Sequence, residues 1–160
     1  AKGMQIELEA FDYDLDKKAL IGPAPLAARF AGEVRCAHQN FGLLVDLSHL
    51  PQTREDARYA LRVVRPYLTH LHIGNAVVTP GAAAYGDQHP RFGIPNGVND
   101  VPELLEFLAA CRDEGLMDAH CLLTLSFEVK PQMGEDADLV VANAKRTLNR
   151  AWALLELPRG

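Results

Sequence analysis

The sequence has few cysteines, no long apolar run and no cluster of basic residues. Its three cysteines, Cys36, Cys111 and Cys121, are widely spaced and form no C-x-x-C pair. We interpret them as the reduced thiols of a cytoplasmic protein. No apolar run approaches the roughly 18 residues that a membrane-spanning helix needs, so no membrane partner is expected.

The charge balance is acidic, with 21 Asp and Glu residues against 16 Lys and Arg residues and a formal net charge of −5. Binding to a nucleic-acid backbone depends on many basic contacts, so no nucleic-acid partner is expected. The 160 residues, 48% hydrophobic and 23% charged, are typical of one soluble globular domain that covers residues 1–160.

Four segments have the pattern of β-strands, and a helical pattern follows each of them. Thr53 is expected to cap the second helix, Asn99 or Asp100 the third, and Asp136 or Asp138 the fourth. The strands are expected at 4–11, 43–45, 68–75 and 121–129, and the helices at 26–34, 57–66, 100–115 and 136–155.

Consecutive strand–helix units build a parallel sheet, so the fold class is α/β. A complete eight-stranded TIM barrel needs about 250 residues, and four such units supply half of one. The chain begins at Ala1-Lys2-Gly3, without an initiator methionine. This favours a fragment of a longer protein, or a half-barrel that another chain completes.

The segment 78–100 is rich in glycine and proline and shows neither helical nor strand periodicity. Structureless segments this long inside compact domains are usually functional lids or disordered. Tyr85, His89, Arg91 and Phe92 favour a lid over disorder.

Each predicted strand ends in an acid or a histidine. Because the carboxyl ends of parallel strands meet at one edge, Glu9, Asp46, His72 and Glu128 are expected to lie together there. Three carboxylates at one place repel each other by about 4 kcal/mol per pair at 4 Å and an effective dielectric near 20. A divalent cation would satisfy these oxygens and the imidazole, and Mn²⁺, Mg²⁺ or Co²⁺ suits such ligands.

Simpler interpretations remain open for the same residues. Lys17, Lys130 or Arg91 could neutralise the acids as salt bridges. Asp46 could cap the segment after its strand, and His49 could then be an ordinary surface loop residue.

The ordered set of four strand ends resembles the metal-site motifs of the xylose isomerase-like TIM-barrel superfamily, the sugar phosphate isomerase/epimerase group, at barrel strands five to eight. The resemblance implies a Glu/Asp/His/Glu site for one Mn²⁺-like ion, at which Glu9 and Glu128 also shuttle a proton through an enediolate and His49 contacts the substrate. The motifs are Leu8-Glu9-Ala10-Phe11, Val45-Asp46-Leu47-Ser48-His49, His70-Leu71-His72-Ile73-Gly74 and Ser126-Phe127-Glu128-Val129.

Two features depart from the ketose epimerases of this group. Val77 and Val78 stand where those enzymes have an arginine, and an insert carries Asp87, His89 and Arg91. Lys130 follows the last motif and is a candidate for binding an anionic or enediol group. The expected substrate-binding residues are therefore His49, His89, Arg91 and Lys130.

The function indicated is that of a divalent-metal-dependent isomerase or epimerase acting on a small carbohydrate. One alternative is a lyase subunit of the same superfamily that cleaves C-glycosides. A second is an endonuclease-like metal phosphodiesterase that would recruit His49, His70 and His89. A third is a half-barrel without catalysis of its own, and association with the missing half or with further copies of the chain is expected.

Overall fold

The computed structural model describes residues 3–156, whose strands form one parallel sheet in the order β1-β2-β3-β4. The α/β fold class is confirmed. The strands are β1 (Ile6–Glu9), β2 (Phe41–Asp46), β3 (Leu68–Ile73) and β4 (Thr124–Phe127). The helices are α1 (Ala24–Arg35), α2 (Leu50–Thr53), α3 (Ala57–Val64), α4 (Val101–Asp113) and α5 (Ala137–Leu155), and a 3₁₀ turn, Arg65–Tyr67, leads into β3.

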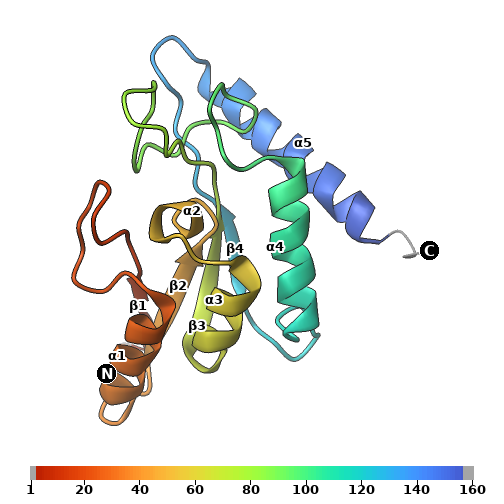
Figure 1. The fold of residues 1–160 in the computed structure, drawn as a ribbon. Helices are drawn as coiled ribbons and strands as arrows, with labels where there is room; N and C mark the ends of the chain where they lie inside the picture. Colours follow the sequence, from red (N-terminus) through yellow and green to blue (C-terminus); the bar gives the residue numbers. More distant parts are fainter. Residues whose placement is uncertain (1–2, 157–160) are drawn as a thin grey trace.

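The long helices α1, α3, α4 and α5 follow one another side by side along the sheet (Figure 1). Successive side chains of a strand point to opposite faces of a sheet. Leu43 and Val45 of β2 and Leu71 of β3 therefore pack in the core with the helices. The alternate positions, including Asp46 and His72, lie on the other face.

Capping side chains begin the helices largely where the sequence predicts. Asp100 and Glu103 form a capping box at α4, and Asp136 accepts from two backbone amides at the start of α5. The expected cap at Thr53 is wrong, because Thr53 is the last residue of the separate short helix α2 and Asp56 caps α3. The short helix α2 therefore lies between β2 and α3.

The outer strands are shorter than predicted. β1 covers four residues of the predicted 4–11, and β4 covers four of the predicted 121–129. Each of them pairs with one neighbour, β1 with β2 and β4 with β3. An outer strand forms backbone hydrogen bonds only along the stretch where its single neighbouring strand runs beside it. The alternation of apolar and polar side chains in the sequence therefore extends beyond the hydrogen-bonded residues.

The segment 78–100 is anchored to the end of β3 by hydrogen bonds. Asn75, at the end of β3, is fully buried. Its Oδ1 accepts from the backbone amides of Ala76, at 2.9 Å, and Asn99, at 2.8 Å, and its Nδ2 donates to the carbonyl of Arg91, at 3.0 Å. Phe92 is 1% exposed. One side chain thus ties the middle of this segment, at Arg91, and its last part, at Asn99, to the end of β3.

Replacing Asn75 with alanine is expected to lower the free energy of unfolding by about 2–4 kcal/mol, because buried amide and carbonyl groups lose their partners. Urea denaturation measures the change. Asn149→Ala, at an exposed position of α5, is the control and should change stability by less than about 0.5 kcal/mol. Equal effects of the two substitutions would contradict the anchoring role.

Within residues 3–156, no helix is long and apolar enough to cross a membrane.

Candidate metal centre

The four residues at the strand ends come together in the folded chain. Glu9, Asp46, His72 and Glu128 each offer one ligand atom, and these atoms all lie within 4.8 Å of one another. Asp46 and His72 are opposite each other in the β2–β3 register. Glu9 ends β1 and Glu128 directly follows β4, so the outer strands supply the two glutamates. The predicted constellation is therefore present as a geometric cluster.

The atoms that face one another in this cluster form no hydrogen bond of regular geometry, although the imidazole of His72 is in ion-pair contact with all three carboxylates. These atoms are Glu9 Oε1, Asp46 Oδ2, His72 Nδ1 and Glu128 Oε2, and all are buried. His72 Nδ1 lies 3.5 Å from Glu9 Oε1, 3.8 Å from Asp46 Oδ2 and against Glu128 Oε2. Among residues 3–156, Gln52 and Asn143 supply the other buried polar side-chain atoms without a hydrogen bond. Buried polar groups normally form hydrogen bonds, so these four convergent exceptions are atoms that could hold a cation.

The pKa shifts around His72 also indicate that the three carboxylates favour a positive charge among them. The carboxylates of Glu128 and Glu9 raise the pKa of His72 to about 10, and His72 in turn lowers the pKa of Glu128 to about 2. Burial raises the pKa of Asp46 to about 6, although the nearby His49 opposes this shift. The protein by itself provides the imidazolium of His72 as the counter-charge for these acids. A divalent ion would supply that charge in its place.

Asp46 serves two purposes with its two oxygens. Its Oδ1 accepts from the backbone amide of Ser48 at 2.6 Å, in the turn between β2 and α2. Its Oδ2 forms no regular hydrogen bond and faces the cluster. This contact orients the carboxylate but does not cap a helix, because His49 is the N-cap residue of α2 and no side chain caps that helix.

Close packing of β3 against β4 depends on Gly74. A Cβ at this position would lie 2.6 Å from the backbone oxygen of Glu128 and 3.4 Å from Nδ1 of His89. The absent side chain lets Glu128 approach His72.

The residues present fit a divalent metal ion. Three carboxylate oxygens and one imidazole nitrogen, all without regular hydrogen bonds, form a mixed O/N donor set. Such a set suits Mn²⁺, Mg²⁺ or Co²⁺.

Comparison with solved structures identifies the fold. D-psicose 3-epimerase from Clostridium cellulolyticum H10, in a structure with D-tagatose, has 20% sequence identity and a TM-score of 0.62 over 94% of this chain and 49% of its own. An L-ribulose 3-epimerase has 17% identity and a TM-score of 0.62 over 99% and 52%. The probable 3-DHS dehydratase AsbF of Bacillus anthracis has 22% identity and a TM-score of 0.52 over 98% and 50%.

The chain has the fold of about half of each of these structures, which is half of a TIM barrel. It spans about half the length of each of these structures. No protein-family model and no curated protein matches the sequence.

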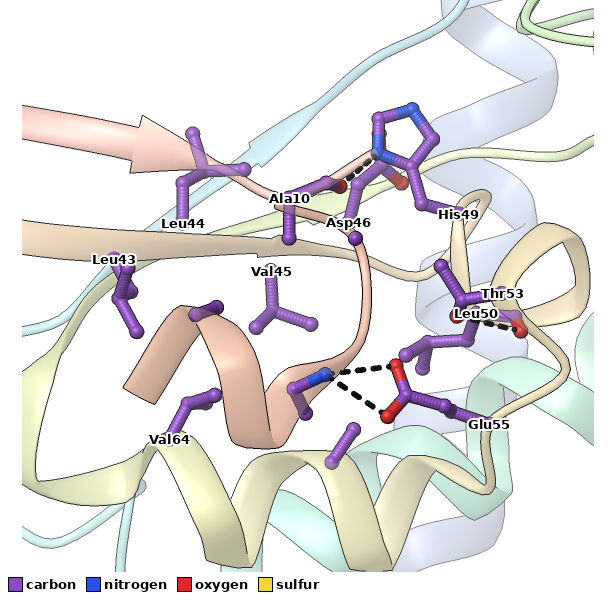
Figure 2. A pocket seen from close by; sticks show the side chains of 14 residues that line it. Ala10, Leu43, Leu44, Val45, Asp46, His49, Leu50, Thr53, Glu55 and Val64 are labelled. Atoms are coloured by element: carbon purple, nitrogen blue, oxygen red, sulfur yellow. Dashed lines mark hydrogen bonds between the residues drawn. The ribbon is translucent and has the colours of Figure 1, made fainter. Parts of the chain in front are cut away.

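His49 of the half-barrel is buried, at 3% exposure, so the surface-loop interpretation of this residue is wrong. Its Nδ1 is 3.0 Å from the carbonyl of Ala10 (Figure 2), and its Nε2 is 2.9 Å from Asp87 Oδ1. Its ring packs on that of Phe11, with centroids 4.6 Å apart. His49 therefore lies next to the candidate metal centre, and protein groups contact both of its ring nitrogens.

The other three expected substrate-binding residues separate into two groups. His89 is buried beside the cluster, with Nε2 3.3 Å from Glu128 Oε1. Arg91 instead pairs with Glu135 at 2.7 Å, and the exposed Lys130 reaches the site region through its backbone amide, which donates to the carbonyl of His89. The structure thus brings His89 to the site and places the side chains of Arg91 and Lys130 elsewhere.

The salt-bridge explanation of the acidic cluster is wrong for the three bases considered. Lys17 pairs with Asp87 at 2.9 Å and Arg91 with Glu135, and no ion pair joins Lys130 to a described residue. Within the described part of the chain, none of these side chains forms an ion pair with Glu9, Asp46 or Glu128.

Two residues near the centre were not among the predicted site residues. Ser48 hydrogen-bonds Nδ1 of His89 at 3.2 Å, and Asp87 contacts both His49 and His89. The only signal for Asp87 in the sequence is its place two residues before His89 in the long segment. Ser48 has no such signal beyond following Asp46 closely.

A small pocket lies on the core side of β2, between β2, α1 and α3 (Figure 2). Its walls are largely alanine, leucine and valine side chains. Glu55, its acidic residue away from the metal centre, accepts from the backbone amide of Ala24 with both oxygens, at 2.9 and 3.1 Å. This pocket belongs to the core, and its volume of about 20 Å³ leaves no room for a sugar.

Proposed function

We propose that this half-barrel provides the metal-binding half of a divalent-metal-dependent sugar isomerase or epimerase. The observation that carries the proposal is the convergence of four buried ligand atoms from four strand ends, none of which forms a hydrogen bond of regular geometry. The shared fold with D-psicose 3-epimerase and L-ribulose 3-epimerase adds support. Glu9, Asp46, His72 and Glu128 would hold one ion, and we propose Mn²⁺.

The burial of the three acids suggests a division of roles. The side chain of Asp46 is fully buried, whereas those of Glu9 and Glu128 are 21% and 33% exposed. Asp46 can reach only the ion, while the two glutamates can also reach a substrate above it. Glu9 and Glu128 are therefore assigned as the residues that remove and return a proton.

The placement of the two glutamates suits epimerisation. They come from the outer strands β1 and β4, with Asp46 and His72 between them. A sugar carbon held between them would meet one carboxylate on each side, so one could take the proton and the other deliver it. A divalent ion bound at this position would stabilise negative charge on neighbouring substrate oxygens.

Residues around the candidate metal centre would bind the sugar. We propose that His89, and His49 through small shifts of its ring, contact substrate hydroxyl groups. Arg91 and Lys130 can contribute only after their side chains turn from their present positions. The strands β1 and β4 each pair on one side within residues 3–156, so the rest of the pocket wall is expected from another half-barrel, in the same protein or in a second chain.

The test is proton exchange with solvent. The intact protein, loaded with Mn²⁺, is incubated in D₂O with D-psicose, D-tagatose, D-fructose and L-ribulose, and NMR follows deuterium incorporation and the epimer formed. We expect deuterium at the carbon next to the carbonyl, together with an epimer or isomer of at least one sugar. Absence of exchange with every sugar, in protein that carries its ion, would contradict the proposal.

A lyase is the second candidate function. The likeness to a probable 3-DHS dehydratase, at 22% identity, favours it, because removal of a proton beside a carbonyl also begins an elimination. Incubation with a C-glycoside separates the two functions. Release of the aglycone without epimerisation of free sugars would favour the lyase.

A further inference from the structure

A hydrogen-bonded chain of three side chains crosses the sheet one layer below the candidate metal centre. Nδ1 of His70, in β3, lies 3.0 Å from Oε2 of Glu7, in β1. Nε2 of the same ring lies 2.6 Å from Oγ of Ser126, in β4. We propose that Glu7, His70 and Ser126 form a clamp that holds the two outer strands at the spacing at which Glu9 and Glu128 share one ion.

Each member of the clamp comes two residues before a residue of the metal centre on the same strand. The pairs are Glu7 and Glu9, His70 and His72, and Ser126 and Glu128. Side chains two residues apart on a strand point to the same face of a sheet, so the clamp and the centre form successive layers of one face. The layers also touch, because the rings of His70 and His72 pack edge to face with centroids 4.7 Å apart.

The outer strands depend on a connection of this kind because they do not pair with each other within residues 3–156. Three strand spacings separate them in the order β1-β2-β3-β4, which amounts to about 14 Å in a flat sheet. Side chains stand roughly perpendicular to a sheet, so the curvature of the sheet decides whether Glu9 and Glu128 converge. Their ligand atoms lie within 4.8 Å of each other. The metal centre therefore depends on the curvature that the clamp would fix.

Gly42 of β2 leaves the path between β1 and β3 open. It is opposite Glu7 in the strand register and shares the face of Asp46. A Cβ at this position would lie 2.2 Å from Oγ1 of Thr69 and 3.0 Å from Nε2 of Gln5. The absence of a side chain at Gly42 thus lets groups of the neighbouring strands close over β2.

The clamp uses both ring nitrogens of His70. A carboxylate only accepts hydrogen bonds, so Nδ1 carries the hydrogen that Glu7 accepts. In the neutral imidazole, Nε2 then accepts from the hydroxyl of Ser126. No further hydrogen-bonding atom of the ring is free, so His70 can join the outer strands only while both contacts are made.

The proposal rests on the metal centre of the proposed function but on no reaction of a sugar. Its first test is the affinity of the intact protein for Mn²⁺, measured by electron paramagnetic resonance of the free ion. We expect Ser126→Ala and His70→Phe to weaken binding by about 10–100-fold, the range typical of groups that support metal ligands. Ser126→Thr, which keeps the hydroxyl, should restore wild-type affinity. Thr124→Ala, at an exposed position of the same strand, is the control and should bind as the wild type does.

An effect of charge alone would give a different pattern of affinities. Ser126→Ala removes no charge, so electrostatics predicts unchanged binding. His70→Phe removes a group that can only be neutral or positive, so electrostatics predicts binding of a cation at least as tight as in the wild type. Weaker binding in both variants therefore supports the clamp, and unchanged or tighter binding in both would overturn it.

The second test measures the spacing of the outer strands in the metal-free protein. Nitroxide labels are attached at Ile6→Cys and Leu125→Cys, both exposed, with Cys36 and Cys121 replaced by serine, and double electron–electron resonance gives the distance. We expect His70→Phe to shift the distance distribution outwards and broaden it, in protein that near-UV circular dichroism shows to be folded. An unchanged distribution would overturn the clamp and leave the proposed function standing. A wider distribution in a protein whose wild type binds no Mn²⁺ would support the clamp and contradict the proposed function.

Discussion

Replacing Glu128 with glutamine is expected to reduce turnover of the sugar substrate by about 10²–10⁴-fold, the range typical of removing a general acid or base. Glutamine keeps the size of the side chain, and its carbonyl oxygen can still approach a cation, but it cannot take up the proton. The substrate is whichever sugar shows deuterium exchange, and steady-state rates at saturating Mn²⁺ measure the change.

The matched control for this substitution is Glu106→Gln, on an exposed position of α4. It removes the same charge outside the metal centre and should leave the rate within about twofold. Single-turnover exchange in D₂O gives a second reading, because loss of exchange at unchanged metal content identifies the proton transfer as the damaged step. A Glu128→Gln protein with wild-type turnover would exclude Glu128 as the acid or base.

Replacing Asp46 with asparagine is expected to abolish stabilisation by Mn²⁺ without weakening the metal-free fold. Asparagine still offers Oδ1 to the amide of Ser48, so the turn after β2 is kept. Its other side-chain atom is an amide nitrogen, which cannot bind a cation. Because burial raises the pKa of Asp46 to about 6, the ionised carboxylate destabilises the metal-free fold above that pH, and the neutral amide does not.

Thermal and urea unfolding at pH 7, with and without Mn²⁺, measures both effects. An ion at 100 times its Kd adds about 2.7 kcal/mol to the stability of the wild type. Asp46→Asn should gain none of this, while its metal-free stability equals or exceeds that of the wild type. Asp118→Asn, at an exposed position, is the control and should respond to Mn²⁺ as the wild type does. Equal stabilisation of Asp46→Asn by Mn²⁺ would contradict the assignment of this ligand.

The strand ends could be read from the sequence because two local rules apply to them. Alternation sends every second side chain of a strand to the same face, and parallel strands end at the same edge of a sheet. Glu9, Asp46 and His72 satisfy both rules, so their meeting point follows from position alone. The same rules predicted β1 and β4 to be longer than they are, because side-chain alternation does not reveal where pairing with the single neighbouring strand ends.

The segment 78–100 was not predictable in the same way. Its path depends on Asn75, which hydrogen-bonds to Arg91 and Asn99, and on Lys17, from a loop far away in the sequence, which pairs with Asp87. No periodicity connects these residues. The burial of His89 and the pairing of Arg91 with Glu135 were therefore decided by contacts that form only after the sheet is assembled.

The sequence by itself determined the α/β class, the order of the strand–helix units and the three acids and one imidazole at one edge, because these depend on residue spacing within short segments. Only the tertiary structure decided that the ligand atoms form no regular hydrogen bond, that His49 is buried and that Asp87 joins two histidines. Those properties depend on what distant segments place around a side chain, and local patterns carry no information about such neighbours.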